Sequence, residues 1–329
     1  MVPSELEMPK DSLFATDYSL RDTKIVNARG LKLAEPLRFA KKYGSKKSYE
    51  PLSLELWEQL IRKGDVICDV GAHHGIYSLL AARSGEAKAI YAYEPVKDNL
   101  AFLKNNARLN KLGAKITTRN SALSNQIGET QFQITEASDN ANIKGHPNSP
   151  TLRATRVETS TLDADFRNSK LDLIKIDTDG YEPYILDGAI KTFKNNPQLR
   201  MLIEFNPKCL RKNQYSPLKF LERLVDLNFE LLLIDDTNDT ILRITNNKRV
   251  WRMIESTPSY YNILCLPAAF PQLQTFIDEH SQTQKHVKNL EKILQDTKNH
   301  KKIAEAKLER IYSTKTWRYI IRPIRRIFR

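Results

Sequence analysis

Cysteine is scarce in this sequence and long apolar runs are missing, and each shortage excludes a class of protein. The three cysteines, Cys68, Cys209 and Cys265, are odd in number and far apart, so they form neither a disulfide framework nor a CxxC metal pair. The N-terminus is acidic and polar where a signal peptide is basic and then apolar. No segment approaches the ~20 apolar residues of a membrane-spanning helix. We therefore expect a cytoplasmic protein that is neither secreted nor transmembrane.

Acidic residues are outnumbered, but the imbalance belongs to one end of the chain. The net charge is +13, and the segment 285–329 holds fourteen Lys or Arg residues against four acidic ones, a net of +10. The preceding chain is therefore nearly neutral. Because the positive charge lies away from the expected catalytic body, it does not indicate a nucleic-acid-binding protein.

Strand-like apolar runs alternate with helical stretches through the middle of the chain. Strands are expected at 65–70, 89–94, 114–119, 171–177, 200–205, 229–235 and 261–267, and helices at 52–61, 75–83, 96–110, 182–193 and 216–227. This alternation predicts βαβ units, and hence a parallel sheet with helices on both faces. No periodic helix separates the last two strands, so they are expected to pair antiparallel. We predict an α/β, Rossmann-like fold with a seven-stranded mixed sheet and one antiparallel strand.

Four segments divide the chain. Residues 1–50 are a polar lead-in and residues 51–268 are the catalytic domain, within which 126–161 is expected to form a hairpin with a long loop. Residues 269–312 are charged and almost free of Gly and Pro, which predicts one long helix. Its imperfect seven-residue apolar repeat fits either a coiled-coil homodimer through 270–312 or a solvated single helix.

Residues 313–329 form a basic tail. On a helix, one face carries its apolar side chains and the arginines lie largely elsewhere, the apolar set being Trp317, Ile320, Ile321, Ile324 and Phe328. This pattern is typical of an interfacial anchor on an anionic membrane surface. The alternative is a tail that docks on the protein's own body or on a partner. We expect a location peripheral to the inner face of the membrane.

A glycine-containing turn, GAHHG at 71–75, joins the first strand of the domain to a helix. Glycine permits a tight turn, and the helix N-terminus offers free N–H groups. Asp69 ends the strand, and Glu94 closes the next one, where a carboxylate can bind a ribose diol. An NAD site uses the same acid with a GxGxxG turn, which is absent. The GxxxG spacing after an acid suits S-adenosylmethionine (SAM), which has no pyrophosphate.

A second group of polar residues closes the strand at 171–177, where ligands bind in open α/β sheets. Asp177 is expected to face donor and acceptor, where its carboxylate accepts a hydroxyl proton or balances the sulfonium charge. Glu204, at the end of the next strand, is the second catalytic candidate. Asp179 and Glu182 either bind the acceptor or cap the following helix. His146, in the inserted loop, is a further acceptor-binding candidate.

The same region argues against two other chemistries. Clustered acids at a strand end need no metal to explain them, so no metal is expected. Methyltransferases that act on nucleic-acid bases carry an Asn-Pro-Pro-aromatic motif after the fourth strand. Here the residues are Asp177-Thr178-Asp179-Gly180, so we expect no nucleic-acid partner.

Five segments together resemble the FkbM family of SAM-dependent methyltransferases: DVGAHHGIYSLLAA, YAYEPVKDNLAFLKNN, STLD, LDLIKIDTDGYEPYILDGA and LIEFNP. The resemblance spans roughly residues 49–267, and family members usually carry Asn in place of His73. It implies SAM as cofactor and O-methylation as the activity. The expected cofactor-binding set is Asp69, Gly71, Ala72, His73, Gly75, Glu94, Ser121, Ala122 and Asp177.

The leading prediction is therefore a SAM-dependent O-methyltransferase. Its acceptor is expected to be a sugar hydroxyl in a cell-surface polysaccharide or its lipid-linked precursor, because the ending Ser-x-x-x-Trp-Arg…Pro-x-Arg resembles tails of bacterial surface-polysaccharide enzymes. Two alternatives stay open: a catalytically weak SAM-fold scaffold in a membrane-associated glycan assembly, and an O-methyltransferase of small natural products.

Overall fold

The computed structural model describes residues 23–36, 40, 49–135, 151–244, 260–268 and 270. The chain divides into two units, 1–271 and 272–329, and every described residue belongs to the first. His146, the predicted long helix apart from Phe270, and the basic tail lie outside the described residues. Within the described part, no helix is both long and apolar enough to cross a bilayer.

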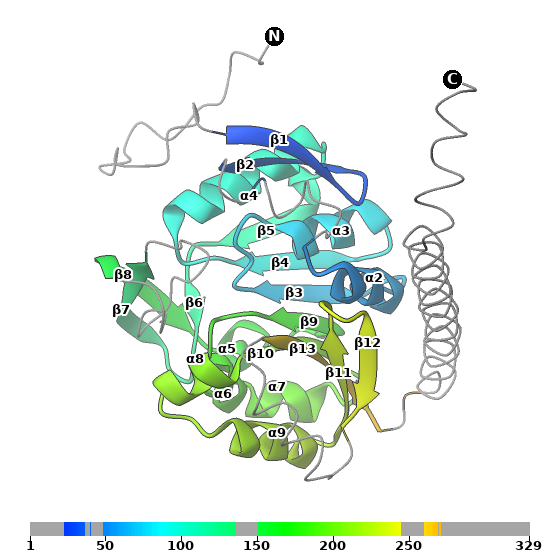
Figure 1. The fold of residues 1–329 in the computed structure, drawn as a ribbon, viewed down its shortest axis with the longest axis vertical. Coiled ribbons are helices and arrows are strands. Elements are labelled where there is room, and N and C mark those ends of the chain that lie inside the picture. Colours follow the sequence, from blue (N-terminus) through cyan, green and yellow to red (C-terminus); the bar gives the residue numbers. More distant parts are fainter. Residues whose placement is uncertain are drawn as a thin grey trace, which may run out of the picture. The chain divides into compact units, whose positions relative to one another are not determined.

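All seven predicted strands are present, and they share one sheet with an eighth (Figure 1). The spatial order is β12 (Thr240–Arg243), β11 (Phe229–Asp235), β13 (Tyr261–Pro267), β10 (Arg200–Phe205), β9 (Leu173–Ile176), β3 (Val66–Val70), β4 (Ala89–Tyr93) and β5 (Ile116–Arg119). The five strands from β10 to β5 run parallel. β13 lies antiparallel between β10 and β11, which confirms the predicted reversal near the end of the domain.

The predicted count of seven strands with one reversal was wrong, because of β12. This strand pairs antiparallel with β11 and so runs in the same direction as β13. The chain reverses immediately after β11, where Asp235 Oδ1 accepts hydrogen bonds from the backbone of Thr237 and Asn238, both at 3.0 Å. β12 has four residues at the sheet edge, all of them at least partly exposed, and therefore lacks the alternation that identifies a strand in sequence.

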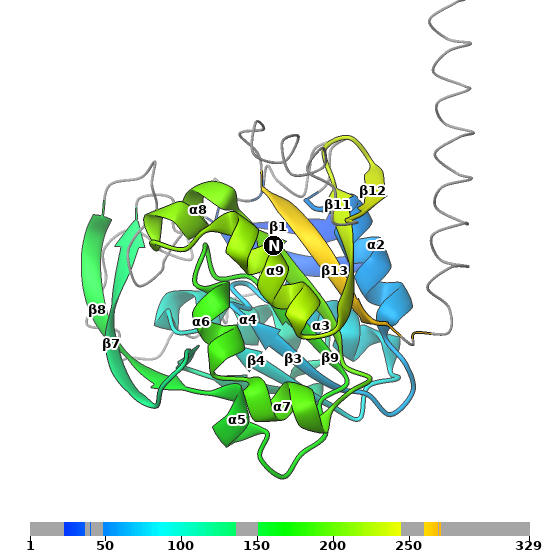
Figure 2. The same cartoon turned by 90° about the horizontal axis from the view of Figure 1, so that it is seen from below.

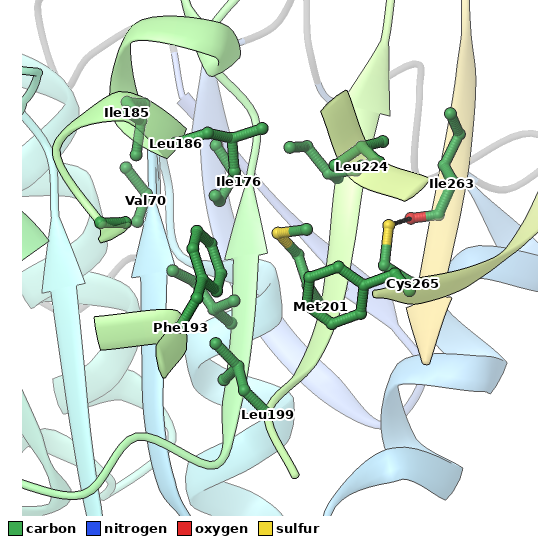
Figure 3. Packing of buried hydrophobic residues seen from close by; sticks show 14 of the residues in the cluster. Val70, Ile176, Ile185, Leu186, Phe193, Leu199, Met201, Leu224, Ile263 and Cys265 are labelled. Atoms are coloured by element: carbon green, nitrogen blue, oxygen red, sulfur yellow. Dashed lines mark hydrogen bonds between the residues drawn. The ribbon is translucent and has the colours of Figure 1, made fainter. Parts of the chain in front are cut away.

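Helices cover both faces of the main sheet (Figures 1 and 2). One face packs against α2 (Pro51–Leu60), α3 (Ile76–Ser84) and α4 (Lys97–Leu109), and the other against α6 (Glu182–Asp187), α7 (Ile190–Asn195) and α9 (Pro217–Asp226). Figure 3 shows the second face, where Met201 and Ile263 of neighbouring strands meet Phe193 and Leu224 of these helices. Such burial of apolar strand residues on both faces is what a doubly wound sheet requires.

The predicted helix at 182–193 is two helices. The chain turns at Gly188 and Ala189 between α6 and α7. Only glycine fits at position 188, because a Cβ there would lie 2.1 Å from Ser124 O. Two short helices, α5 (Leu162–Asp165) and α8 (Pro207–Lys212), were not predicted. In α8 the side chain of Asn206 accepts a hydrogen bond from Cys209 N, and a proline follows the cap, which is an ordinary helix-start signal.

Two smaller sheets flank the core. β7 (Gly128–Thr135) and β8 (Thr151–Ser160) form the predicted hairpin, and β6 (Ala122–Leu123) pairs with β8. The lead-in contains an unpredicted hairpin, β1 (Thr23–Ala28) and β2 (Leu31–Pro36). β2 contacts α4, so part of the lead-in belongs to the folded body (Figure 1).

Candidate active site

The turn after β3 is tied to its neighbours on both sides. The backbone N–H groups of Gly71 and Ala72 both donate to Tyr93 O at 3.0 Å. Asp69 Oδ2 accepts hydrogen bonds from Ser78 N at 3.0 Å and from Ser78 Oγ at 2.6 Å. Burial raises the pKa of Asp69 to about 6, against the opposing effect of these bonds. Asp69 therefore fastens the end of β3 to the first turn of α3.

The two glycines of this turn have left-handed backbones, with φ of 79° at Gly71 and 92° at Gly75. A Cβ on Gly71 would lie 1.9 Å from Asp177 O, and a Cβ on Gly75 would lie 2.7 Å from Leu103 Cγ. The predicted tight turn is confirmed. Neither glycine can be replaced by a residue with a side chain without a clash, and the atoms that such a side chain would meet belong to Asp177 and Leu103. Gly71 thus brings the turn against the end of β9, where Asp177 N also donates to Val70 O at 3.0 Å.

Glu94 follows β4 and is almost completely buried. Its Oε2 accepts from His73 N at 2.8 Å, and its Oε1 accepts from Val96 N at 2.8 Å and from Asn99 Nδ2 at 3.4 Å. Burial raises the pKa of Glu94 to about 7. An ionised carboxylate accepts about four hydrogen bonds, so it retains capacity for a hydroxyl donor. A carboxylate held rigidly beside the turn by backbone N–H groups fits the ribose diol of a cofactor such as SAM.

Ser121 and Ala122 come shortly after β5, and the neighbouring Asn120 connects this segment to Glu94. Asn120 Nδ2 donates to Glu94 O at 3.0 Å, which joins the two strand ends. Ala122 packs with Val96 in a small apolar cluster under the β7–β8 hairpin. Ser121 lines a polar cavity of about 640 Å³ on the flank of β4 and β5. That cavity is not lined by Glu94 or Asp177, so it is separate from the predicted centre.

The residues that close β9 surround a buried lysine, Lys175, which belongs to the same polar group in the sequence but had no role predicted for it. Lys175 Nζ donates to Asp177 Oδ2 at 2.9 Å and to Asn262 Oδ1 at 3.1 Å, and it lies 5.0 Å from the centre of the Tyr77 ring. Burial opposes its charge, but Asp177 and Glu50 outweigh that effect and the pKa of Lys175 is raised. The ammonium group thus stays charged and holds one oxygen of Asp177.

This polar network extends far along the sequence. Asn262 Nδ2 donates to Ser53 Oγ at 3.0 Å, and Ser53 Oγ donates to Asp236 Oδ2 at 2.5 Å. Glu50 Oε2 accepts the Tyr77 hydroxyl at 2.5 Å, and burial raises the pKa of Glu50 to about 7. The sequence does mark two members of this network, because Asn262 in YNILCLP and Lys175 in LIKI are polar residues inside otherwise apolar strands.

The remaining acids gather around Asp177. Glu204 is buried, and its Oε2 has no hydrogen-bond partner among the described residues. Burial, followed by Asp177, Asp179 and Glu182, raises its pKa well above the usual range. Glu182 Oε1 accepts from Thr178 N at 2.9 Å and from Gly180 N at 3.1 Å, so it holds the turn in which Asp179 has a φ of 53°.

The acid cluster is not arranged as a metal site. No group of three or more His, Cys, Asp or Glu side chains in the described residues could hold a metal ion. The structure does bring the two predicted constellations to one edge of the sheet, since Gly71 and Val70 contact the backbone of Asp177. The acceptor-binding roles of Asp179, Glu182 and His146 stay predictions.

A family model described as the methyltransferase FkbM domain matches residues 69–231. The chain carries an FkbM methyltransferase domain. The matched range begins at Asp69 and includes Glu94, Asp177 and Glu204, so the resemblance seen in the sequence is confirmed. No curated protein matches the chain.

Several solved structures are similar to it. An FkbM methyltransferase from Methylobacillus flagellatus is 14% identical over 64% of this chain, with a TM-score of 0.38, and the chain spans 50% of that protein's length. A putative methyltransferase from Streptococcus mutans in complex with SAH is 10% identical over 65% of this chain and 95% of its own, with a TM-score of 0.40. A SAM-dependent O-methyltransferase from Thermotoga maritima is 14% identical over 74% of this chain and 77% of its own, also at 0.40. The FkbM domain is identified by the match at 69–231 and not by these distant structures.

Proposed function

We propose that the protein is a SAM-dependent O-methyltransferase in which Glu94 binds the ribose diol and Asp177 faces the acceptor hydroxyl. The observation that carries the proposal is the contact between the cofactor turn and the end of β9. Gly71 approaches Asp177 O so closely that no side chain fits between them. A ligand that rests on the turn and on Glu94 therefore extends toward Asp177 and the acids around it.

SAM supplies an activated methyl group, so the protein's main task is alignment, and a general base increases the rate by about 10²- to 10⁴-fold. Lys175 fixes one oxygen of Asp177 and leaves the second, on a side chain that is one-quarter exposed, to face an acceptor. Glu204 is close enough to Asp177 for that carboxylate to help raise its pKa well above the usual range, so Glu204 keeps its proton and can hydrogen-bond the acceptor oxygen. Asp177 would accept the proton of the acceptor hydroxyl while the acceptor oxygen takes the methyl group, and the S–CH₃ bond of the sulfonium would break to leave SAH.

The proposed acceptor is a sugar hydroxyl of a cell-surface polysaccharide or its lipid-linked precursor. Glu204 Oε2 and Glu182 Oε2 are buried carboxyl oxygens that have no hydrogen-bond partner within the described part of the chain, and the several O–H donors of a polyol would satisfy them well. The basic tail at 313–329 supports a peripheral location on the inner membrane face, where such precursors are assembled. The segment 270–312 is proposed to form a helix that joins two copies of the chain.

Calorimetric titration with SAM and SAH tests the cofactor assignment first. We expect both to bind and NAD to give no heat. Failure of both to bind overturns the proposal. Mass spectrometry of surface glycans from cells with and without the gene then tests the acceptor. In the cells without the gene, one sugar is expected to be lighter by ~14 Da, the mass of the CH₂ that one methylation adds. SAM binding with unchanged glycans favours the scaffold alternative instead.

A further inference from the structure

We infer that Glu35 and His74 are positioning residues for the cofactor, and that they fix Glu94 through the backbone of His73. This inference rests on the proposed role of Glu94 in binding the ribose diol. Both residues lie outside the acid cluster around Asp177, and Glu35 also lies outside the matched FkbM range. The pair therefore extends the cofactor site into the lead-in hairpin.

The first observation is the burial of the pair. His74 Nδ1 and Glu35 Oε2 are 2.5 Å apart, and the two side chains are 3% and 1% exposed. The His74 ring also packs against Phe102, with ring centres 4.7 Å apart. A polar pair enclosed in this way has few alternative positions, because each partner would lose its hydrogen bond without gaining water.

The second observation links the pair to Glu94. The rings of His73 and His74 stack with their centres 3.8 Å apart, and His73 has a φ of 49°, in the region that non-glycine residues seldom occupy. In that conformation His73 N points at Glu94 Oε2, 2.8 Å away. Because this N–H is one of the two backbone donors that hold Glu94, a change at residues 73–74 reorients the carboxylate that faces the diol.

The third observation is a second tie between the hairpin and the same turn. Asn106 is fully buried in α4. Its Oδ1 accepts a hydrogen bond from Ala34 N at 2.7 Å, and its Nδ2 donates one to His74 O at 3.0 Å. The side chain and the backbone carbonyl of His74 are therefore both connected to neighbouring residues of β2. This double attachment explains why a strained backbone persists in the turn, since strain survives only where its surroundings fix it.

A matched control exists on the same strand. Asn110 binds both the N–H and the C=O of Lys32, at 2.9 and 2.7 Å, and so anchors β2 to α4 without touching the turn. Asn110→Ala loosens the hairpin as a structural element, whereas Glu35→Ala removes the partner of His74. If the pair only stabilises the fold, the two variants should affect ligand binding equally.

The experiment measures SAH binding by calorimetry and unfolding by thermal denaturation on the full chain. Glu35→Ala should weaken SAH about tenfold, a shift of about 1.4 kcal/mol. Glu35→Gln, whose amide oxygen accepts the same hydrogen bond, should recover most of that affinity. Asn110→Ala should lower the melting temperature and leave SAH affinity within about twofold. Should Glu35→Ala fail to fold, His74→Asn takes its place.

A double-mutant cycle with Glu94→Gln separates the inference from the function on which it rests. Because Glu35 acts through Glu94, the double variant Glu35→Ala/Glu94→Gln should bind SAH no more weakly than Glu94→Gln alone. Additive losses, or equal losses from Asn110→Ala and Glu35→Ala, overturn the positioning role and leave the cofactor site in place. Unchanged SAH affinity in Glu94→Gln overturns the proposed site itself.

Discussion

Replacing Gly71 by alanine tests the contact that joins the cofactor turn to the end of β9. The new Cβ would lie 1.9 Å from Asp177 O, whereas ordinary contact begins near 3.4 Å, so the turn and the strand must separate. The left-handed φ of 79° adds a cost of about 1–2 kcal/mol for any side chain. Separating the two backbones adds about 1–3 kcal/mol, as forced overpacking does. We expect a total loss of roughly 2–5 kcal/mol in unfolding free energy.

Gly85 provides the matched control for this variant. Its φ of 74° is nearly the same, but nothing lies within 4 Å of the position a Cβ would take. Gly85→Ala should therefore lose only the conformational part, about 1–2 kcal/mol. Urea denaturation measures both losses, and calorimetry should show SAH affinity reduced only by Gly71→Ala. Equal destabilisation by the two variants, with equal SAH affinity, would refute the argument that this contact builds the site.

Three further perturbations have expected outcomes. Lys175→Met leaves buried carboxylates without their cation and should lower the unfolding free energy by roughly 3–5 kcal/mol in urea denaturation, and a loss below about 1 kcal/mol would contradict the network. The folded-state pKa of Glu94 is raised to about 7, so its contribution to stability is complete below its unfolded value and is lost as pH rises through 7. Thermal denaturation between pH 5 and 8 should accordingly show a shallower decline in Glu94→Gln than in the natural protein, and parallel declines would contradict this assignment. Deleting residues 313–329 should abolish co-sedimentation with anionic vesicles and leave SAH affinity intact, whereas persistent sedimentation would show that the tail is not the anchor.

The main strands were predictable because their apolar residues are buried on both faces, as in β3 and β10. The lead-in hairpin escaped prediction although its sequence holds a signal: apolar residues alternate on either side of Arg29 and Gly30, and both turn residues have positive φ. The pattern is weak in β1 because this strand is half exposed and the apolar Ile25 lies on its exposed part. The break at Gly188 depends on its distance from Ser124, which no local pattern contains.

The candidate site was predictable where its residues stand at the ends of parallel strands. Asp69 lies near the end of β3, and Glu94 and Asp177 directly follow β4 and β9. Parallel strands end at one edge of the sheet, so the proximity of these residues follows from topology. The positions of the residues that hydrogen-bond to this site do not follow from topology. Lys175 meets Asn262 from 87 positions away, and Glu35 meets His74 from 39 positions away. Such pairs become visible only when the hairpin and the reversed strand are placed.

The reversed strand β13 explains why Asn262 completes the site. β13 lies between β10 and β11, and its antiparallel register sets Asn262 opposite Glu204. From there the Asn262 amide reaches both Lys175 Nζ and Ser53 Oγ, which connects β9 to the start of α2. Both Ser53 and Asn262 lie outside the matched range 69–231. A fragment limited to that range would keep Asp69, Glu94 and Asp177 but lose Asn262 and Ser53, which connect Lys175 to the rest of the network, so the flanking segments are part of the candidate site and not additions to it.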